Sequence, residues 1–216
     1  MFCPSIYCGI HFGLRSFMDS IKAVIFDLDG TITEPFFDFD AIRIEMGLSK
    51  DAGPILEAME KMTNDQRQKA QKILDYHEQL AVRESNLNPG TYETLDKLRQ
   101  MNIKIGILTR NTKDNAFAIA KKHNLKFDAV VSREDGPVKP DAFGVLELCR
   151  IFDILPAQTL VVGDYLFDLL CAKAAGAAAV LLENHKNAKQ FSQFANFTIH
   201  NLSQILEIIK KSNIKN

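Results

Sequence analysis

The stretch from Val24 to Thr31, VIFDLDGT, decides the fold of this chain. Residues 22–26 form a short run of β-branched and aromatic side chains, which indicates a buried strand rather than a helix. Two carboxylates, Asp27 and Asp29, follow directly, and alternate residues of a strand point to the same side. Charge gathered in this way resists desolvation unless a cation is bound, so the pattern predicts a divalent metal site. Taken alone, the stretch is also compatible with an Asp-Gly turn whose carboxylates are solvated.

The composition is that of an ordinary soluble globular protein. The 216 residues are 46% apolar and 25% charged with a net charge of -1, which suits one well-packed domain with a modest insertion. The chain has no basic block, so we expect neither nucleic acid nor a membrane as a partner. No CxxC pair occurs, so we expect reduced thiols in a cytoplasmic protein; the cysteines are Cys3, Cys8, Cys149 and Cys171. Residues 1–20 are read as an N-terminal leader of unknown function, and they lack the basic start of a signal peptide.

Apolar runs and amphipathic segments alternate along most of the chain. The apolar runs predict further strands at residues 103–108, 127–131, 159–163, 177–182 and 197–199. The segments between them predict helices at residues 91–101, 113–123, 141–152, 165–175 and 202–211. This alternation is typical of an α/β protein, and we predict a Rossmann-like three-layer core with a parallel sheet, formed by residues 21–33 and 89–216.

The alternation fails once, between residues 34 and 88. This stretch has no convincing strand and reads as helices at residues 39–46, 54–62 and 65–84. Because it directly follows the Asp-rich run, we predict a small all-helical cap over the carboxyl edge of the sheet, where α/β folds bind ligands. The alternative is that these helices simply pack against the core.

Polar side chains follow four of the predicted strands. Asp27 and Asp29 follow the first, Thr109 the second, Lys139 the third after a loop, and Asp164 the fourth. The carboxyl ends of parallel strands share one edge of the sheet, so we expect these groups to converge. Each also has an ordinary explanation, since Thr and Asp often cap helices and most lysines lie at the surface. A single functional site is a better explanation than four independent ordinary roles at the same edge of the sheet.

The same positions resemble the four ordered motifs of the haloacid dehalogenase superfamily. The matching segments are residues 27–31, Thr109, the Lys139-Pro140 pair, and Gly163-Asp164 with Asp168. The resemblance covers about residues 22–182, and the helical insertion is similar to the small caps of phosphoglycolate-phosphatase-like members. Two positions depart from the pattern: Ala142 stands where many relatives carry Pro, and Tyr165 replaces a small residue.

The resemblance implies a Mg²⁺-dependent phosphatase that acts on a small phosphorylated metabolite through an aspartyl-phosphate. Asp27 would attack phosphorus, while Asp29 would protonate the leaving group and then activate water. Mg²⁺ would be held by Asp27, the backbone carbonyl of Asp29, and Asp164, with Asp168 acting through water.

The remaining site residues are expected to bind the substrate. Thr109, the backbone near Arg110, and Lys139 would hold the phosphoryl oxygens. Arg43 and Arg110 are candidates to grip a substrate carboxylate or second phosphate, with a solvated arginine as the alternative for each. The histidines form no ligand pattern.

Three other activities are weighed against a phosphatase. A dehalogenase does not need the acid at Asp29, which this chain keeps. A phosphomutase uses the same core but needs a cap that excludes water, and the short polar insertion favours hydrolysis. A catalytically inactive binding protein of the same fold is not expected, because every motif residue is retained.

We expect the protein to be a monomer or a homodimer.

Overall fold

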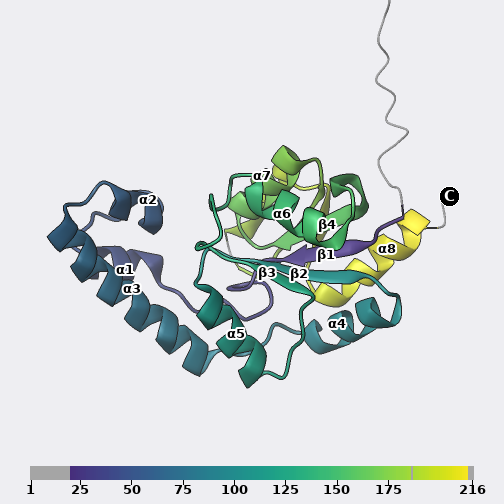
Figure 1. The fold of residues 1–216 in the computed structure, drawn as a ribbon, viewed down its shortest axis with the longest axis horizontal. Coiled ribbons are helices and arrows are strands. Elements are labelled where there is room, and N and C mark those ends of the chain that lie inside the picture. Colours follow the sequence, from purple (N-terminus) through teal and green to yellow (C-terminus); the bar gives the residue numbers. More distant parts are fainter. Residues whose placement is uncertain (1–19, 186, 214–216) are drawn as a thin grey trace, which may run out of the picture.

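A six-stranded parallel sheet lies at the centre of the computed structural model, which describes residues 20–185 and 187–213 (Figure 1). The strands are β1 (Ala23–Phe26), β2 (Lys104–Leu108), β3 (Ala129–Val131), β4 (Thr159–Gly163), β5 (Ala178–Leu182) and β6 (Phe197–Ile199). Their order is β3-β2-β1-β4-β5-β6, so β1 pairs with β2 on one side and β4 on the other. The chain builds the sheet in one direction from β1 and then crosses back to β4. Ligands bind at such a switch point in α/β sheets.

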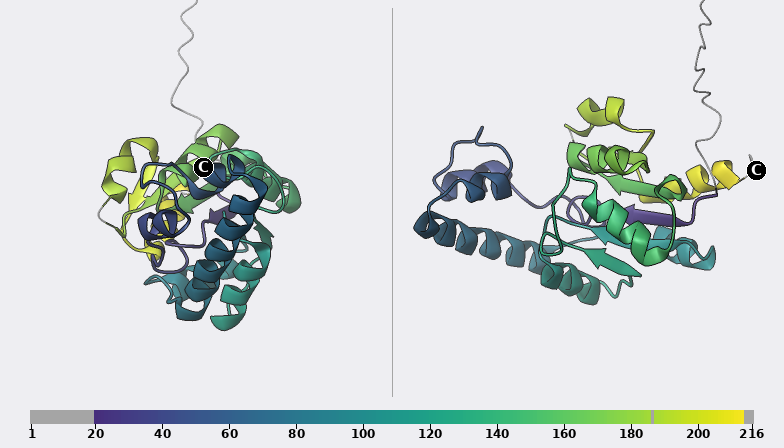
Figure 2. Two further views of the ribbon diagram at one scale, coloured as in Figure 1. Left: turned by 90° about the vertical axis from the view of Figure 1, so that its left-hand side faces the viewer. Right: turned by 45° about the horizontal axis from the view of Figure 1, so that its top comes forward.

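The two faces of the sheet carry separate apolar clusters, because side chains alternate along each strand. Val24 and Phe26 belong to one cluster, whereas Ile25 between them belongs to the other. Helices α4 (Thr91–Gln100), α5 (Lys113–Lys122) and α8 (Ile205–Asn213) lie on one side of the sheet, and α6 (Phe143–Phe152) and α7 (Leu166–Ala175) lie on the other (Figures 1 and 2). Short 3-10 turns at Pro156–Gln158, Ala188–Phe194 and Leu202–Gln204 complete the connections. The predicted α/β fold with its three-layer core is confirmed.

Two predicted elements begin two residues earlier than the real ones. The predicted strand at residues 127–131 begins only at Ala129, because the Asp128 carboxylate accepts the Ile105 amide at 2.8 Å, a donor that a longer β3 would need. The predicted helix at residues 141–152 begins at Phe143, whose amide instead donates to the Asp141 carboxylate at 2.8 Å.

The insertion at residues 34–88 is helical and lies to one side of the core (Figure 1). It contains α1 (Phe39–Glu45), α2 (Ile55–Glu60) and α3 (Asn64–Glu84). It has a small apolar cluster of its own, formed by Ile42, Ile55, Met59, Ala70 and Leu74. Helix α3 packs against α1 and α2 at one end and against α5 of the core at the other. The exact domain boundaries at residues 34 and 88 stay predictions.

The two ends of the insertion are held together beside the end of β1. The Glu34 amide donates to the Asn86 carbonyl at 2.9 Å, and Thr33 and Leu87 form an antiparallel bridge. The buried side-chain amide of Asn88 lies 2.8–2.9 Å from the carbonyl oxygens of Gly30, Thr31 and Thr33. These bonds fix the turn after β1 independently of where the insertion helices lie.

The sequence analysis also made predictions about the N-terminal leader, the cysteines and the membrane. The predicted leader lies outside the described residues except for Ser20, and Cys3 and Cys8 also lie outside them. Cys149 and Cys171 are free and buried. Within residues 20–185 and 187–213, no helix combines the length and apolar character needed to cross a membrane.

Candidate active site

A cavity of about 460 Å³ separates the carboxyl ends of the central strands from the insertion. The structure brings every predicted site residue to its wall: Asp27, Asp29, Thr109, Arg110, Lys139, Asp164 and Asp168. Arg43 of the insertion lines the same cavity. The expected convergence at one sheet edge is therefore present in the structure.

The two carboxylates after β1 reach the cavity by different backbone routes. The Asp27 amide still donates to the Val162 carbonyl of β4 at 2.8 Å, but β1 has ended at Phe26. Asp29 lies in a turn, in which the Leu28 carbonyl accepts the Ile32 amide at 3.0 Å. The expectation that a strand pleat aligns Asp27 with Asp29 is wrong, because the chain turns before Asp29.

This turn requires glycine at position 30. Gly30 has φ +93°, a left-handed conformation that other residues rarely adopt. A Cβ atom there would also lie 2.5 Å from Oδ2 of Asp164. Glycine therefore lets the turn approach Asp164, whose other carboxylate oxygen accepts a 3.4 Å hydrogen bond from the Thr31 hydroxyl.

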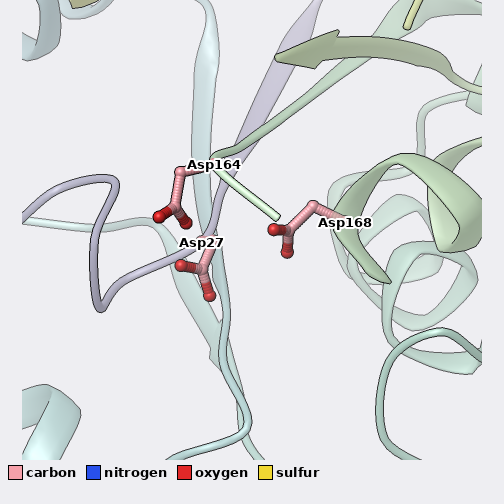
Figure 3. Close-up of side chains that lie close together, drawn as sticks. All are labelled: Asp27, Asp164 and Asp168. Carbon is pink, nitrogen blue, oxygen red and sulfur yellow. The ribbon is translucent and has the colours of Figure 1, made fainter. Parts of the chain in front are cut away.

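Asp27, Asp164 and Asp168 form a cluster of carboxylates (Figure 3). Asp27 follows β1, Asp164 follows β4, and Asp168 lies in the first turn of α7. One oxygen from each lies within 4.8 Å of the others. The Lys139 ammonium donates to Asp27 and, at 2.7 Å, to Asp168. The buried Lys139 thus binds two of the three acidic groups.

The electrostatics of this cluster favour an additional cation. Burial raises the pKa of Asp27 well above its usual value, and burial together with the Asp168 charge raises the pKa of Asp164 to about 7. Burial opposes the charge of Lys139, but the Asp168 and Asp27 carboxylates outweigh it and raise the pKa of the lysine. One lysine cannot balance three carboxylates, so the excess negative charge suits a divalent ion.

The donor set is compatible with Mg²⁺. Mg²⁺ takes oxygen ligands at about 2.0–2.1 Å, so two ligands of one ion lie at most about 4.2 Å apart. The observed 4.8 Å span of the carboxylate oxygens is within a small side-chain adjustment of that limit. The Asp29 side chain is outside this cluster, and a role for its backbone carbonyl as a ligand stays a prediction.

Asp29 lies beside the cluster in a different environment. Burial raises its pKa, against the opposing effect of the 3.2 Å hydrogen bond that it accepts from Asn111. Asn111 is buried and lines the cavity, and sequence reasoning missed it. Its place two residues after Thr109, in the same loop, was the available signal.

Thr109 is not a helix cap. Its amide donates to the Val131 carbonyl at 3.0 Å, and its buried hydroxyl accepts the Asn111 amide at 3.0 Å. The residue that caps α5 is Thr112, whose hydroxyl accepts the Asn115 amide. The alternative explanation of Thr109 as a cap is therefore wrong.

Two arginines of the core bind carboxylates of the insertion. Arg110 donates to Glu57 of α2 at 2.6 Å and to the Lys139 carbonyl. Arg133, after β3, makes a two-pronged contact with the buried Glu78 of α3, one arm at 3.1 Å. Burial raises the pKa of Glu78 despite the opposing charge of Arg133. Sequence reasoning missed the Arg133–Glu78 pair, because its members are 55 residues apart and follow no local pattern.

Comparisons with known proteins agree with this geometry. The family model described as haloacid dehalogenase-like hydrolase matches residues 37–182. A haloacid dehalogenase-like hydrolase domain-containing protein of Arabidopsis thaliana is 32% identical over 174 residues, which cover 76% of this chain and 71% of that protein. A phosphoglycolate phosphatase of Chromobacterium violaceum is 26% identical over 217 residues, covering 88% and 97% of the two chains. The crystal structure of a hydrolase from Pseudomonas syringae has a TM-score of 0.74 at 21% identity, covering 88% of this chain and 98% of that one.

Proposed function

The chain belongs to the haloacid dehalogenase-like hydrolases, and we propose that it is a phosphatase that hydrolyses a small phosphate monoester through an aspartyl-phosphate on Asp27. The observation that carries this proposal is the meeting of Asp27 with Lys139, Asp164 and Asp168 around one buried point. Relatives named as phosphatases support it.

The proposed nucleophile is held by the groups around it. The Lys139 ammonium binds the Asp27 carboxylate and orients it. The same ammonium keeps positive charge close to the phosphoryl group that Asp27 would attack. The Thr109 hydroxyl already accepts the Asn111 amide, so its own proton is available to a phosphoryl oxygen. Donors set in place in this way stabilise charge as it moves during the reaction.

Mg²⁺ is the proposed cofactor. Asp27, Asp164 and the Asp29 carbonyl would hold it, with Asp168 contributing through water. When bound, it would neutralise charge on the phosphoryl oxygens. This role is compatible with the excess of carboxylates over lysine in the cluster.

Asp29 is the proposed general acid and base. Its raised pKa favours a proton on the carboxyl group, which it would deliver to the leaving alkoxide. The resulting carboxylate would then take a proton from the water that attacks the aspartyl-phosphate. Monoester hydrolysis needs accelerations of up to about 10²¹-fold, more than any single group supplies, so several groups must act together.

We further propose that the insertion acts as a cap over the site. It supplies part of the cavity wall and reaches the core through Glu57 and Glu78. The partner would then be a small phosphorylated metabolite enclosed between cap and core.

Phosphate release from generic monoesters with Mg²⁺ tests the proposal. We expect turnover by the native protein and a loss of at least about 10⁴-fold in Asp27→Asn, because the nucleophile is gone. Asp96→Asn makes the same chemical change at an exposed position of α4 and should keep full activity. Turnover no faster than that of Asp27→Asn would indicate an inactive binding protein. Transfer of the phosphoryl group to a second hydroxyl, without release, would indicate a mutase.

A further inference from the structure

The insertion lines the cavity mainly with apolar side chains. They are Phe37, Phe39, Pro54, Ile55, Leu56 and Leu74. The core adds Tyr165 and Phe167 to the same wall. A phosphoryl group needs none of these side chains, so they are available to the rest of the substrate.

Some of these rings are exposed although they lie on the cavity wall. The Phe39 side chain is stacked on Phe37 with ring centroids 5.4 Å apart, and Phe39 is 51% exposed. Tyr165 meets Phe167 edge to face at 5.1 Å and is 48% exposed. Pockets lined by rings of this kind bury the apolar part of a ligand. The wall therefore offers apolar area to a substrate.

The positively charged side chains on the same wall already have acidic partners. Arg43 binds Asp40 at 3.0 Å and the Gly53 carbonyl at 2.9 Å. Arg133 binds Glu78. Lys139 belongs to the carboxylate cluster. Among the described residues that line the cavity, the remaining cation is Arg110, and Glu57 binds it at 2.6 Å.

Glu57 binds the guanidinium group of Arg110, which lies on the cavity wall and could otherwise bind a carboxylate of the substrate. The Arg110 guanidinium is also fixed by the Lys139 carbonyl and lies over the Phe167 ring, 5.1 Å from its centroid. It is thus a rigid carboxylate-binding group beside the loop that carries Lys139. The insertion brings its own carboxylate to this group.

We propose that Glu57 is a built-in carboxylate that occupies Arg110 and selects against substrates with a second anionic group. The preferred substrates are phosphate monoesters whose alcohol carries an uncharged, largely apolar group. A substrate carboxylate would have to displace a tethered competitor of high effective concentration and would enter beside a like charge. This inference rests on the proposed phosphatase activity.

A matched pair of esters tests the substrate class. The two esters are pentyl phosphate and its analogue in which a carboxylate is attached to the carbon farthest from the phosphate. Both have primary alkoxide leaving groups of similar basicity, so a difference in kcat/KM reflects how the alcohol part is bound. We expect kcat/KM for the uncharged ester to be at least about tenfold higher. An equal or higher value for the carboxylate ester would overturn the inference. If neither ester nor 4-nitrophenyl phosphate is hydrolysed, the proposed function itself has failed.

The variant Glu57→Gln tests whether Glu57 causes the preference for the uncharged ester. It should free Arg110 and narrow the preference for the uncharged ester by about fivefold, the size of a partly exposed ion pair. Glu60→Gln makes the same change at an exposed position of the same helix and should leave the preference for the uncharged ester unaltered. An equal fall in kcat/KM for both esters in Glu57→Gln would show that Glu57 only holds the cap, and would overturn the assigned role.

Discussion

The two walls of the cavity are built in opposite ways. On the sheet edge, Asp27, Lys139 and Asp168 are 8%, 4% and 3% exposed and bind one another. On the insertion, Phe37 and Phe39 are stacked, and Phe39 is half exposed. Buried charges that depend on one another cannot be changed singly without disturbing the rest, whereas exposed rings can. This contrast is consistent with our proposal that the core wall carries the chemistry and that the insertion wall selects the substrate.

Among the variants that test this difference between the two walls, we expect the largest loss of turnover at Asp29. In Asp29→Asn, turnover should fall by about 10²–10⁴-fold, because the variant lacks the group that activates water. The first half-reaction with 4-nitrophenyl phosphate should survive, since 4-nitrophenolate leaves without a proton. Stopped-flow absorbance should therefore show a burst of 4-nitrophenolate equal to the enzyme concentration, followed by a stall.

Asp27→Asn is the control for this burst, because it removes the carboxylate that would accept phosphorus. It should give neither burst nor turnover. A steady-state rate in Asp29→Asn equal to that of the native protein would contradict the role of Asp29.

A smaller and more selective effect is expected at Phe39. Phe39→Ala should lower kcat/KM for pentyl phosphate by about tenfold, because the apolar wall loses a ring that is half exposed and available to the substrate. It should leave kcat/KM for methyl phosphate nearly unchanged, since that ester does not reach the ring. Phe36→Ala is the matched control, because Phe36 is 42% exposed and lies outside the cavity wall. Equal losses for both esters in Phe39→Ala would break the division between the walls.

The smallest effect concerns stability and pH. The pKa of Asp164 rises from 3.8 to about 7 in the folded protein, mainly through burial. The stability linked to its protonated form is therefore present below about pH 4 and lost as pH rises through about 7. The proposed Mg²⁺ would bind the deprotonated carboxylates, so we expect it to raise Tm more at about pH 8 than at about pH 5.

Differential scanning calorimetry of protein freed of metal by a chelator measures this difference. Asp164→Asn should reduce the Mg²⁺-dependent rise in Tm at the higher pH. A rise of equal size at both pH values would show that these carboxylates do not bind the ion.

The core wall was predictable from sequence because its residues follow strands. Apolar runs located β1, β2 and β4, and parallel pairing then places the residues after them at one edge. Asp27, Thr109 and Asp164 could be assigned in this way. Lys139 follows β3 only after a loop, and its motif was needed to include it.

The insertion wall was not predictable in the same way. Its helices could be recognised, but the pairing of Glu57 with Arg110 depends on how two units meet. Neither residue type is unusual in a helix or a loop, and the two are 53 residues apart. The end of β1 at Phe26 was predicted correctly, and Asp29-Gly30 was recognised as a possible turn. The error was to extend the alternation of the strand to Asp29, which lies beyond its end.

The two ends of the insertion lie side by side, and this affects which changes in its length the fold can accept. Thr33 and Leu87 face each other in an antiparallel bridge, and the side chain of Asn88 binds the turn after β1. A hairpin turn of about two residues is enough to connect a pair placed in this way. We therefore expect residues 35–85 to tolerate changes of length better than the turn after β1, because the bonds that close the insertion lie outside them.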